Sequence, residues 1–309
     1  MRIAFIGHND FGKAALEAFI ARGDTVAGVF CAPEKPGAKP DPVRLAAQAH
    51  GLPLFQLKSL RTDAAVQAMR ELDAELGVMA YVLQFASQEF VNTPRLGTIQ
   101  YHPSLLPLHR GPSSISWPIA LGARQTGLSI FRPTDGLDEG PVILQKTVAI
   151  GPDDTLGDIY FKQLFPLGVQ ALLEASTLVV SGSHAEQPQD EAQASYEGWF
   201  HEEESRIHWG NHVDHVYNLI RACNPAPGAW TVIGGEKVFV FDCRKRTIRR
   251  HGQIRGKPGE ITAITDDAIV FDAHGGEIEV LRLRPEGGAK IGAGDYARAR
   301  GLVTVFAKP

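Results

Sequence analysis

Residues 1–31 read MRIAFIGHNDFGKAALEAFIARGDTVAGVFC. An apolar run at 3–7 ends in a glycine, apolar residues at helical spacing follow at 11–21, and a second apolar run covers 25–31. Short buried strands that alternate with amphipathic helices are typical of a parallel sheet built from βα repeats. This opening therefore predicts an α/β fold.

The same alternation continues to about residue 182. Further strands are predicted at 76–82, 98–102, 127–131 and 142–149, and helices at 42–50, 62–71, 87–92, 113–120 and 155–180. We therefore expect residues 1–182 to form one domain. Its fold should be a doubly wound, mostly parallel, Rossmann-like sheet with helices on both faces.

The second part of the chain has a different pattern. Residues 183–203 are polar and Gln-rich, which is typical of a linker. Beyond them one helix is predicted at 213–222, followed by short β-type runs separated by glycine pairs, at 230–233, 237–241, 268–271 and 278–283. This pattern predicts a small OB-like β-barrel domain over 204–309.

Composition excludes several classes of protein. The 309 residues are 44% hydrophobic and 21% charged, and the net charge is −4, so no overall positive field attracts nucleic acid or an anionic membrane. Three widely spaced cysteines exclude a disulfide framework and a zinc ribbon. Neither a signal peptide nor 18 uninterrupted apolar residues is present, so we expect a cytoplasmic protein without a membrane span.

Two weaker patterns predict no cofactor site. Residues 7–12, GHNDFG, follow the first strand, but their spacing is G-x-x-x-x-G rather than G-x-G-x-x-G, so a structural turn is favoured over an NAD-dependent oxidoreductase. His208, His212 and His215 are spaced for one helix face, where we expect solvated or capping roles rather than a metal. No metal site is predicted.

The strongest chemical signal lies in residues 99–111, IQYHPSLLPLHRG. This predicted strand breaks at Pro103, and ligands bind at the carboxyl ends of strands in open α/β sheets. Gln100 and His102 are two residues apart, so their side chains share a face. A later acidic loop, TDGLDEG at 134–140, offers Asp135, Asp138 or Glu139 to orient the imidazole.

These segments carry a family resemblance. HPSLLP at 102–107 with Arg110-Gly111, and GLDEGPVILQ at 136–145, resemble the signature segments of enzymes that use 10-formyltetrahydrofolate. That group includes methionyl-tRNA, glycinamide ribonucleotide and sugar formyltransferases and the hydrolase domain of 10-formyltetrahydrofolate dehydrogenase. RIHW at 206–209, IRACNPAPGAW at 220–230 and LRPEGGAK at 283–290 resemble the second domain of the tRNA enzyme, and the first two also that of the dehydrogenase's hydrolase domain.

The resemblance implies roles for individual residues. His102 becomes the catalytic imidazole and Asp138 the catalytic carboxylate, while Gln100 stands where the transferases have Asn and the dehydrogenase's hydrolase domain has an aliphatic residue. The loop at 80–86 is similar to one whose backbone grips the pterin ring. The expected folate-binding residues are Tyr81, Val82, Leu83, Gln84, Phe85, Ser104, Leu105, Leu106, Pro107, Arg110 and Asp135.

The formyl acceptor is left open by the sequence. The short loop at 32–41 and Tyr101 resemble the dehydrogenase's hydrolase domain and argue against tRNA. The stretch 244–257 carries seven basic residues without an acid, which suits either several phosphates or a solvated hairpin. A full dehydrogenase is not expected, because the chain ends before such further domains.

Three functions therefore remain. The first is a formyltransferase that formylates an amine on a small molecule, a sugar or an aminoacyl-tRNA. The second is a hydrolase that passes the formyl group to water. The third is a non-catalytic folate-binding protein. Oligomeric state is not predicted.

Overall fold

The computed structural model describes residues 1–248, 256–302 and 304, and the chain divides into two compact units. Unit 1 comprises Met1–Gly111, Gly127–Val148 and Phe161–Tyr196. Unit 2 comprises Pro112–Thr126, Ala149–Tyr160 and the described part of Glu197–Pro309. The domain boundaries predicted at residues 182 and 203 stay a prediction.

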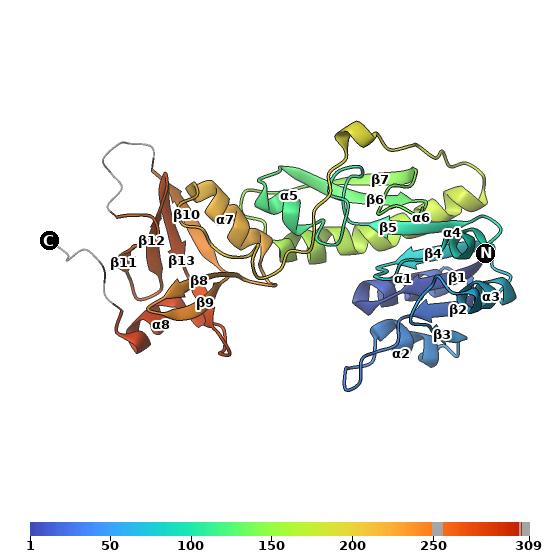
Figure 1. The fold of residues 1–309 in the computed structure, drawn as a ribbon, viewed down its shortest axis with the longest axis horizontal. Helices are drawn as coiled ribbons and strands as arrows, with labels where there is room; N and C mark the ends of the chain where they lie inside the picture. The colour runs from blue at the N-terminus through green and yellow to red at the C-terminus, as the bar shows by residue number, and fades with distance from the viewer. Residues whose placement is uncertain (249–255, 303, 305–309) are drawn as a thin grey trace. The chain divides into compact units, whose positions relative to one another are not determined.

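The centre of unit 1 is a seven-stranded sheet with the order β3-β2-β1-β4-β5-β6-β7 (Figure 1). Its strands are β1 (Arg2–Gly7), β2 (Thr25–Cys31), β3 (Leu54–Gln56), β4 (Leu76–Ala80), β5 (Thr98–His102), β6 (Gln125–Phe131) and β7 (Val142–Ala149). The first five pair in parallel, and β6 runs antiparallel to β5. The predicted mostly parallel sheet is confirmed.

Helices pack on this sheet through apolar faces. They are α1 (Asn9–Ala21), α2 (Pro42–Ala49), α3 (Asp63–Glu71), α4 (Gln88–Asn92), and a π-helix η1 (Asp158–Leu164) that continues as α6 (Phe165–Val180). Successive side chains of β1 pack against helices on opposite faces of the sheet, because side chains alternate along a strand. Phe5 meets Phe19 of α1 edge-on, whereas Ile6 belongs to the cluster that contains residues of α3 and α4.

The long helix α6 lies close to β5. A Cβ on Gly168 would come within 2.6 Å of the Tyr101 ring and 3.0 Å of the Phe11 ring, so glycine permits this approach. Tyr101 stacks on Phe11 with ring centroids 4.3 Å apart. Tyr101 therefore fills the core side of β5, which leaves the alternate residues Gln100 and His102 for the other face.

By length and composition, the helical stretch Asp158–Val180 is one that could cross a membrane. Its α6 part contacts α1, β4 and β5. These contacts are those of an apolar core helix packed on a sheet, which meets the same length and composition criteria.

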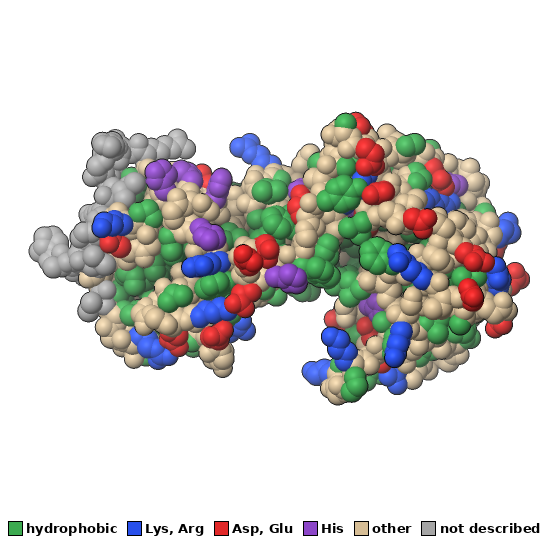
Figure 2. Space-filling model, viewed as in Figure 1, with side chains coloured by type: hydrophobic (Ala, Val, Ile, Leu, Met, Phe, Trp, Pro, Cys, Tyr) green, Lys and Arg blue, Asp and Glu red, His purple; other side chains and the backbone are tan. Residues whose placement is uncertain are grey.

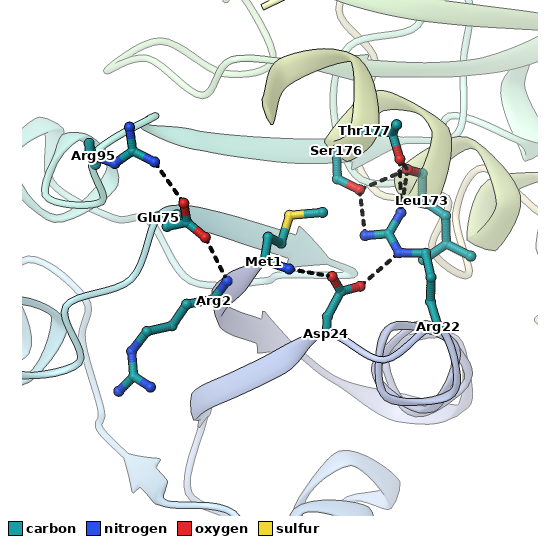
Figure 3. A network of polar contacts seen from close by, with 9 residues as sticks. All are labelled: Met1, Arg2, Arg22, Asp24, Glu75, Arg95, Leu173, Ser176 and Thr177. Atoms are coloured by element: carbon teal, nitrogen blue, oxygen red, sulfur yellow. Dashed lines mark hydrogen bonds and ion pairs between the residues drawn. The ribbon is translucent and has the colours of Figure 1, made fainter. Parts of the chain in front are cut away.

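Polar contacts fasten the amino ends of the strands (Figure 3). The N-terminal amino group of Met1 lies 3.0 Å from Asp24, which also accepts a 2.7 Å bond from Arg22. The Arg22 guanidinium donates to Ser176 and to the Leu173 carbonyl of α6. The carboxyl ends of the strands, at the opposite edge, carry the candidate site.

Unit 2 contains two four-stranded antiparallel sheets, ordered β10-β13-β12-β11 and β15-β14-β9-β8. The strands are β8 (Ala229–Ile233), β9 (Glu236–Val240), β10 (Cys243–Thr247), β11 (Ile261–Ile264), β12 (Ile269–Ala273), β13 (Gly276–Val280), β14 (Arg282–Pro285) and β15 (Ile291–Gly292). Its helices are α5 (Ser116–Ala120), α7 (Val213–Ala222) and α8 (Ala293–Arg300).

The expected OB-like barrel is not confirmed. Within residues 197–248 and 256–302 the strands form two separate sheets and no closed barrel. One break falls between β13 and β14, which the sequence pattern had merged into a single run at 278–283. Leu281 interrupts that run, and its N–H donates to the Asp242 carbonyl outside both sheets.

Candidate active site

His102 and Asp138 come together at the carboxyl end of β5. His102 is the last residue of the strand and is 6% exposed, and Asp138 is 8% exposed in the loop between β6 and β7. The Nδ1 atom of His102 lies 3.5 Å from Oδ2 of Asp138, and its Nε2 atom lies 2.9 Å from the carbonyl oxygen of His109. The structure thus brings this predicted pair together.

The two acceptors around the ring have a chemical consequence. A neutral imidazole has one N–H and can donate it to only one of them, whereas an imidazolium can donate to both. Asp138 is therefore placed to stabilise His102 when the ring gains a proton. The N–H of Gly111 donates to the same Asp138 oxygen at 3.0 Å, which fixes the carboxylate.

Left-handed backbone conformations gather around this edge of the sheet. Among the described residues other than glycine, positive φ angles occur at Asn9 (59°), Asp73 (46°), Tyr81 (60°), His109 (57°) and Asp138 (56°). Tyr81, His109 and Asp138 lie in the loops that follow β4, β5 and β6, and Asn9 is the first residue of α1, just after β1. Such conformations are sparsely populated and concentrate at functional sites. These conformations were not predicted from the sequence.

The loop at 103–111 is held by a hydrogen bond within the loop and by others from β6 and β7. The hydroxyl of Ser104 donates to the Leu108 carbonyl at 2.6 Å, and Ser129 of β6 donates to the Ser104 carbonyl at 2.7 Å. Gln145 of β7 donates to the Leu106 carbonyl at 2.8 Å. Of the predicted folate-binding residues here, Ser104 and Leu106 are buried, and Leu105 and Pro107 are half-buried.

Gln100 lies two residues before His102 on β5 and is half-buried. No hydrogen bond to its side-chain amide occurs within the described part of the chain. Its Cα pairs with Met79 of β4 and with Phe131 of β6, so the residue stands in the middle of the sheet near its carboxyl edge. The amide thus lies on the His102 face without a hydrogen-bond partner among the described residues.

The loop that follows β4 exposes apolar side chains. Tyr81, Leu83 and Phe85 are 38%, 59% and 57% exposed, and the Arg61 guanidinium lies 5.0 Å from the Phe85 ring centroid. Val82 and Gln84 are half-buried. Because β4 and β5 are parallel neighbours, this loop and His102 emerge at the same edge of the sheet.

Several polar groups in this loop make no hydrogen bond within the described residues. Within the described residues, the backbone N–H and C=O groups of 81–84 make no hydrogen bond to another backbone group. The Gln84 amide nitrogen donates to the Leu57 carbonyl at 2.8 Å, but its buried Oε1 has no partner there. Exposed rings beside free backbone groups suit a flat heterocycle that has both apolar faces and polar edges.

Arg110 has a different surrounding from the one predicted. Its side chain is 1% exposed, and it makes five hydrogen bonds to Gln189, Glu191 and Tyr196. A guanidinium has five N–H groups, so none is left for a bound folate. These partners raise the pKa of Arg110, with the Glu191 carboxylate as the main cause. The sequence prediction missed all three partners, because they lie in the expected linker.

The three candidate carboxylates of the acidic loop differ in burial. Only Asp138 of the three is buried; Asp135 and Glu139 are exposed. Glu139 accepts a 2.8 Å hydrogen bond from the Tyr196 hydroxyl, which raises the pKa of that tyrosine. Of the three, Asp138 is thus the one whose carboxylate the structure places beside the His102 ring.

The turn at residues 7–12 is closed by an internal carboxylate. Asp41 accepts from the N–H of Asn9 at the start of α1 and from the N–H of Val43 at the start of α2. Its Oδ2 lies 3.6 Å from Nδ1 of His8, whose pKa is lowered by burial although Asp41 opposes that effect. The turn thus already holds an anion, one supplied by the 32–41 loop.

The basic stretch at 244–257 is partly neutralised. Lys245 lies 2.5 Å from Asp214, Arg246 pairs with Glu277, and Arg244 lies 3.7 Å from Glu279. Figure 2 shows the resulting surface, on which acidic and basic side chains of unit 2 are interspersed. Arg249, Arg250 and Arg255 lie outside the described residues.

The histidine-rich segment before α7 has a local structural role. Nδ1 of His212 accepts the Asp214 N–H at 3.3 Å and caps the helix, as predicted. In the described ranges, no group of three or more His, Cys, Asp and Glu side chains is placed to hold a metal ion. His208 and His215 line a pocket of about 230 Å³ on unit 2, which none of the predicted site residues borders.

Comparison with known proteins agrees with this architecture. Residues 1–175 match the formyl transferase domain, and residues 200–301 match the formyl transferase C-terminal domain. The chain is 35% identical over 310 residues to mitochondrial 10-formyltetrahydrofolate dehydrogenase of Mus musculus, covering 97% of this chain but 33% of the mouse protein. It therefore spans about a third of the length of that relative.

Two further likenesses extend along most of the chain. Methionyl-tRNA formyltransferase of Geobacter metallireducens is 30% identical over 301 residues, which cover 96% of this chain and 94% of that enzyme. The crystal structure of HypX from Aquifex aeolicus in complex with tetrahydrofolic acid shares the fold, with a TM-score of 0.67 at 21% identity over 97% of this chain and 47% of that one. On the two matched domains and the full-length bacterial relative, this chain belongs to the formyl transferase family.

Proposed function

We propose that this protein takes the formyl group from 10-formyltetrahydrofolate at His102 and Asp138 and transfers it to an amine acceptor. The observation that carries the proposal is the buried His102–Asp138 pair, which meets at the carboxyl edge of the sheet beside the exposed 81–85 loop. Two relatives that are 30% identical or more are named for 10-formyltetrahydrofolate or for formyl transfer.

The folate is proposed to bind against the 81–85 loop. Its pterin ring would cover the exposed Leu83 and Phe85 side chains and pair with the free backbone groups of 81–84. Gln84 Oε1 is a buried acceptor without a partner in the described chain, and a ring N–H would satisfy it. Leu105 and Pro107, which are half-buried, would extend the apolar wall.

The chemistry follows from the charges that formyl transfer creates. Attack of the acceptor on the formyl carbon forms a new bond and places negative charge on the formyl oxygen, and the bond from that carbon to the folate nitrogen then breaks. The attacking group loses a proton, and the folate nitrogen gains one. His102 is proposed to accept the first proton and to deliver it to the leaving nitrogen. Asp138 stabilises the imidazolium in between, and the Gln100 amide, which has no hydrogen-bond partner within the described residues, stabilises the oxyanion.

Water is a second candidate acceptor, favoured by two observations. Asp41 binds the 32–41 loop to the turn after β1 by accepting from the Asn9 N–H. Its carboxylate therefore occupies the N-terminus of α1, a position that could otherwise bind an anionic group of the substrate. Position 100 carries Gln, where the resemblance predicts Asn in a transferase. With water as the acceptor, the products are formate and tetrahydrofolate.

One experiment separates the acceptors. The enzyme is mixed with 10-formyltetrahydrofolate alone, with charged initiator tRNA, and with an amino sugar nucleotide, and formate and tetrahydrofolate are both measured. Formyl transfer predicts tetrahydrofolate only when an amine acceptor is present, with little formate. Equal amounts of formate and tetrahydrofolate in every mixture would establish the hydrolase instead. Folate binding without either product would contradict both reactions.

A further inference from the structure

Residues 187–196, within the expected linker, bind both loops of the candidate site. We name this segment the strap. Its Gln187 exchanges two backbone hydrogen bonds with Val142 at the start of β7, of 2.8 and 2.9 Å. Its Ser195 accepts from the N–H groups of His109 and Arg110 and donates its own N–H to the Pro107 carbonyl. The strap therefore joins the loop after β5 to the loop after β6.

Gln189 lies at the centre of the strap and holds the backbone of Asp138. Its amide nitrogen donates to the Asp138 carbonyl at 2.8 Å and to the Gly140 carbonyl at 2.7 Å. Asp138 has a φ of 56°, a left-handed conformation that residues with a Cβ populate sparsely, although Asp adopts it more readily than most. The two hydrogen bonds from Gln189 act on that backbone segment.

Arg110 fixes the other end of the Gln189 amide. Gln189 Oε1 accepts from Nε of Arg110 at 3.1 Å and from its Nη2 at 2.9 Å. Arg110 is itself buried and is anchored by Glu191 and Tyr196 of the strap. Because both Oε1 and Nε2 are engaged, the amide cannot rotate without losing partners on both sides.

We propose that Gln189 is a positioning residue, which aims the Asp138 carboxylate at His102 through the backbone of the loop. The proposal rests on the function proposed above. Hydrogen-bond partners that orient the ligands of a metal site contribute about 10- to 100-fold to affinity or activity, and we expect an effect of the same order for Gln189. The strap would then help to position the catalytic carboxylate, besides connecting unit 1 to unit 2.

The test uses two matched substitutions in the full chain. Gln189→Glu has nearly the same shape and keeps the acceptor for Arg110, but it places an oxygen without a proton against the carbonyls of Asp138 and Gly140. Gln187→Glu makes the same chemical change two residues away on an exposed side chain, whose residue joins the sheet through its backbone only. Single-turnover release of the formyl group, tetrahydrofolate affinity and the unfolding midpoint are measured for each.

Gln189→Glu is expected to slow the single turnover about 10- to 100-fold, with tetrahydrofolate affinity within about twofold of wild type. Gln187→Glu should match wild type. In an Asp138→Asn background, Gln189→Glu should cost less than about twofold, because its effect passes through Asp138. Gln189→Leu removes the amide without adding charge, and it should reproduce the loss if the glutamate variant unfolds.

Three results would overturn the positioning role. They are an unchanged rate in both Gln189 variants, an equal loss in Gln187→Glu, or the same loss in the Asp138→Asn background as in wild type. An inactive wild-type enzyme that binds tetrahydrofolate would instead refute the proposed function. The two failures are therefore distinguishable.

Discussion

Nδ1 of His102 lies 3.5 Å from Oδ2 of Asp138, although the first residue ends β5 and the second lies in the loop beyond β6. This separation exceeds that of a normal N–H···O hydrogen bond, whereas the bond from Nε2 to the His109 carbonyl, at 2.9 Å, is of ordinary length. The pair is thus arranged so that uptake of a proton by the ring strengthens the contact with Asp138.

The first prediction concerns Gln100 as the oxyanion donor. Replacing Gln100 with Leu removes the amide and should lower the rate of formyl release about 100-fold, since one such donor contributes about 10²–10³-fold. Gln100→Asn keeps an amide that is one methylene shorter, so it should retain more activity than Gln100→Leu. Single-turnover rates with 10-formyltetrahydrofolate measure both. Equal rates for wild type and Gln100→Leu would remove Gln100 from the mechanism.

The second prediction concerns the folate-binding loop. Leu83 is 59% exposed, and a bound pterin would cover it. Leu83→Ser should weaken tetrahydrofolate binding about tenfold, which corresponds to about 1.4 kcal/mol, while kcat changes little. Titration calorimetry measures the affinity, and Leu121→Ser, on a residue that is 66% exposed in unit 2, is the control. Equal affinities for the two variants would place the folate elsewhere.

The third prediction concerns the pH dependence of stability. The pKa of Glu34 is lowered from its ordinary 4.5 to about 2. The largest cause is the hydrogen bond from the Asp41 N–H, the next is the one from the Gln56 amide, and the Arg44 guanidinium has a smaller effect. The folded state therefore favours the carboxylate, and this stabilisation is present above pH 4.5 and is lost as the pH falls toward 2. It amounts to roughly 1–2 kcal/mol after allowance for solvent screening.

Urea unfolding between pH 7 and pH 2.5 checks this linkage. Glu34→Gln should be less stable than wild type at pH 7, and the difference should shrink as the pH falls. Glu17→Gln, which alters a half-exposed carboxylate on α1, should show no such trend. A gap between Glu34→Gln and wild type that stays constant with pH would show that the Glu34 charge is not involved.

Much of unit 1 could be predicted because its signals are local. The apolar runs at β2, β5 and β7 coincide with the predicted strands, and the α7 helix of unit 2 was also predicted with its observed bounds. The three-residue strand β3 was missed because Leu54–Gln56 has no periodicity of its own. Strand β10 lies in the 244–257 stretch, for which the sequence left a hairpin and a phosphate-binding segment open. Its basic residues are paired with acids on β13 and α7, a contact that only the fold reveals.

The candidate site was predicted in part for the same reason. The strand break after His102 and the acidic loop are visible in the sequence, so their meeting could be expected from sheet topology. The contacts of the strap could not be predicted, since a polar, Gln-rich segment has the same composition whether it is solvated or hydrogen-bonded to two loops. Arg110 shows the difference, because its five donors all turn inward toward that segment.

His102 and Asp138 are expected to act together on the formyl group. Single-turnover loss of 10-formyltetrahydrofolate is measured in wild type, His102→Ala and Asp138→Asn, with tetrahydrofolate affinity measured in parallel. Each substitution should slow the turnover at least about 100-fold while the folate still binds. A near wild-type rate in either variant would contradict it.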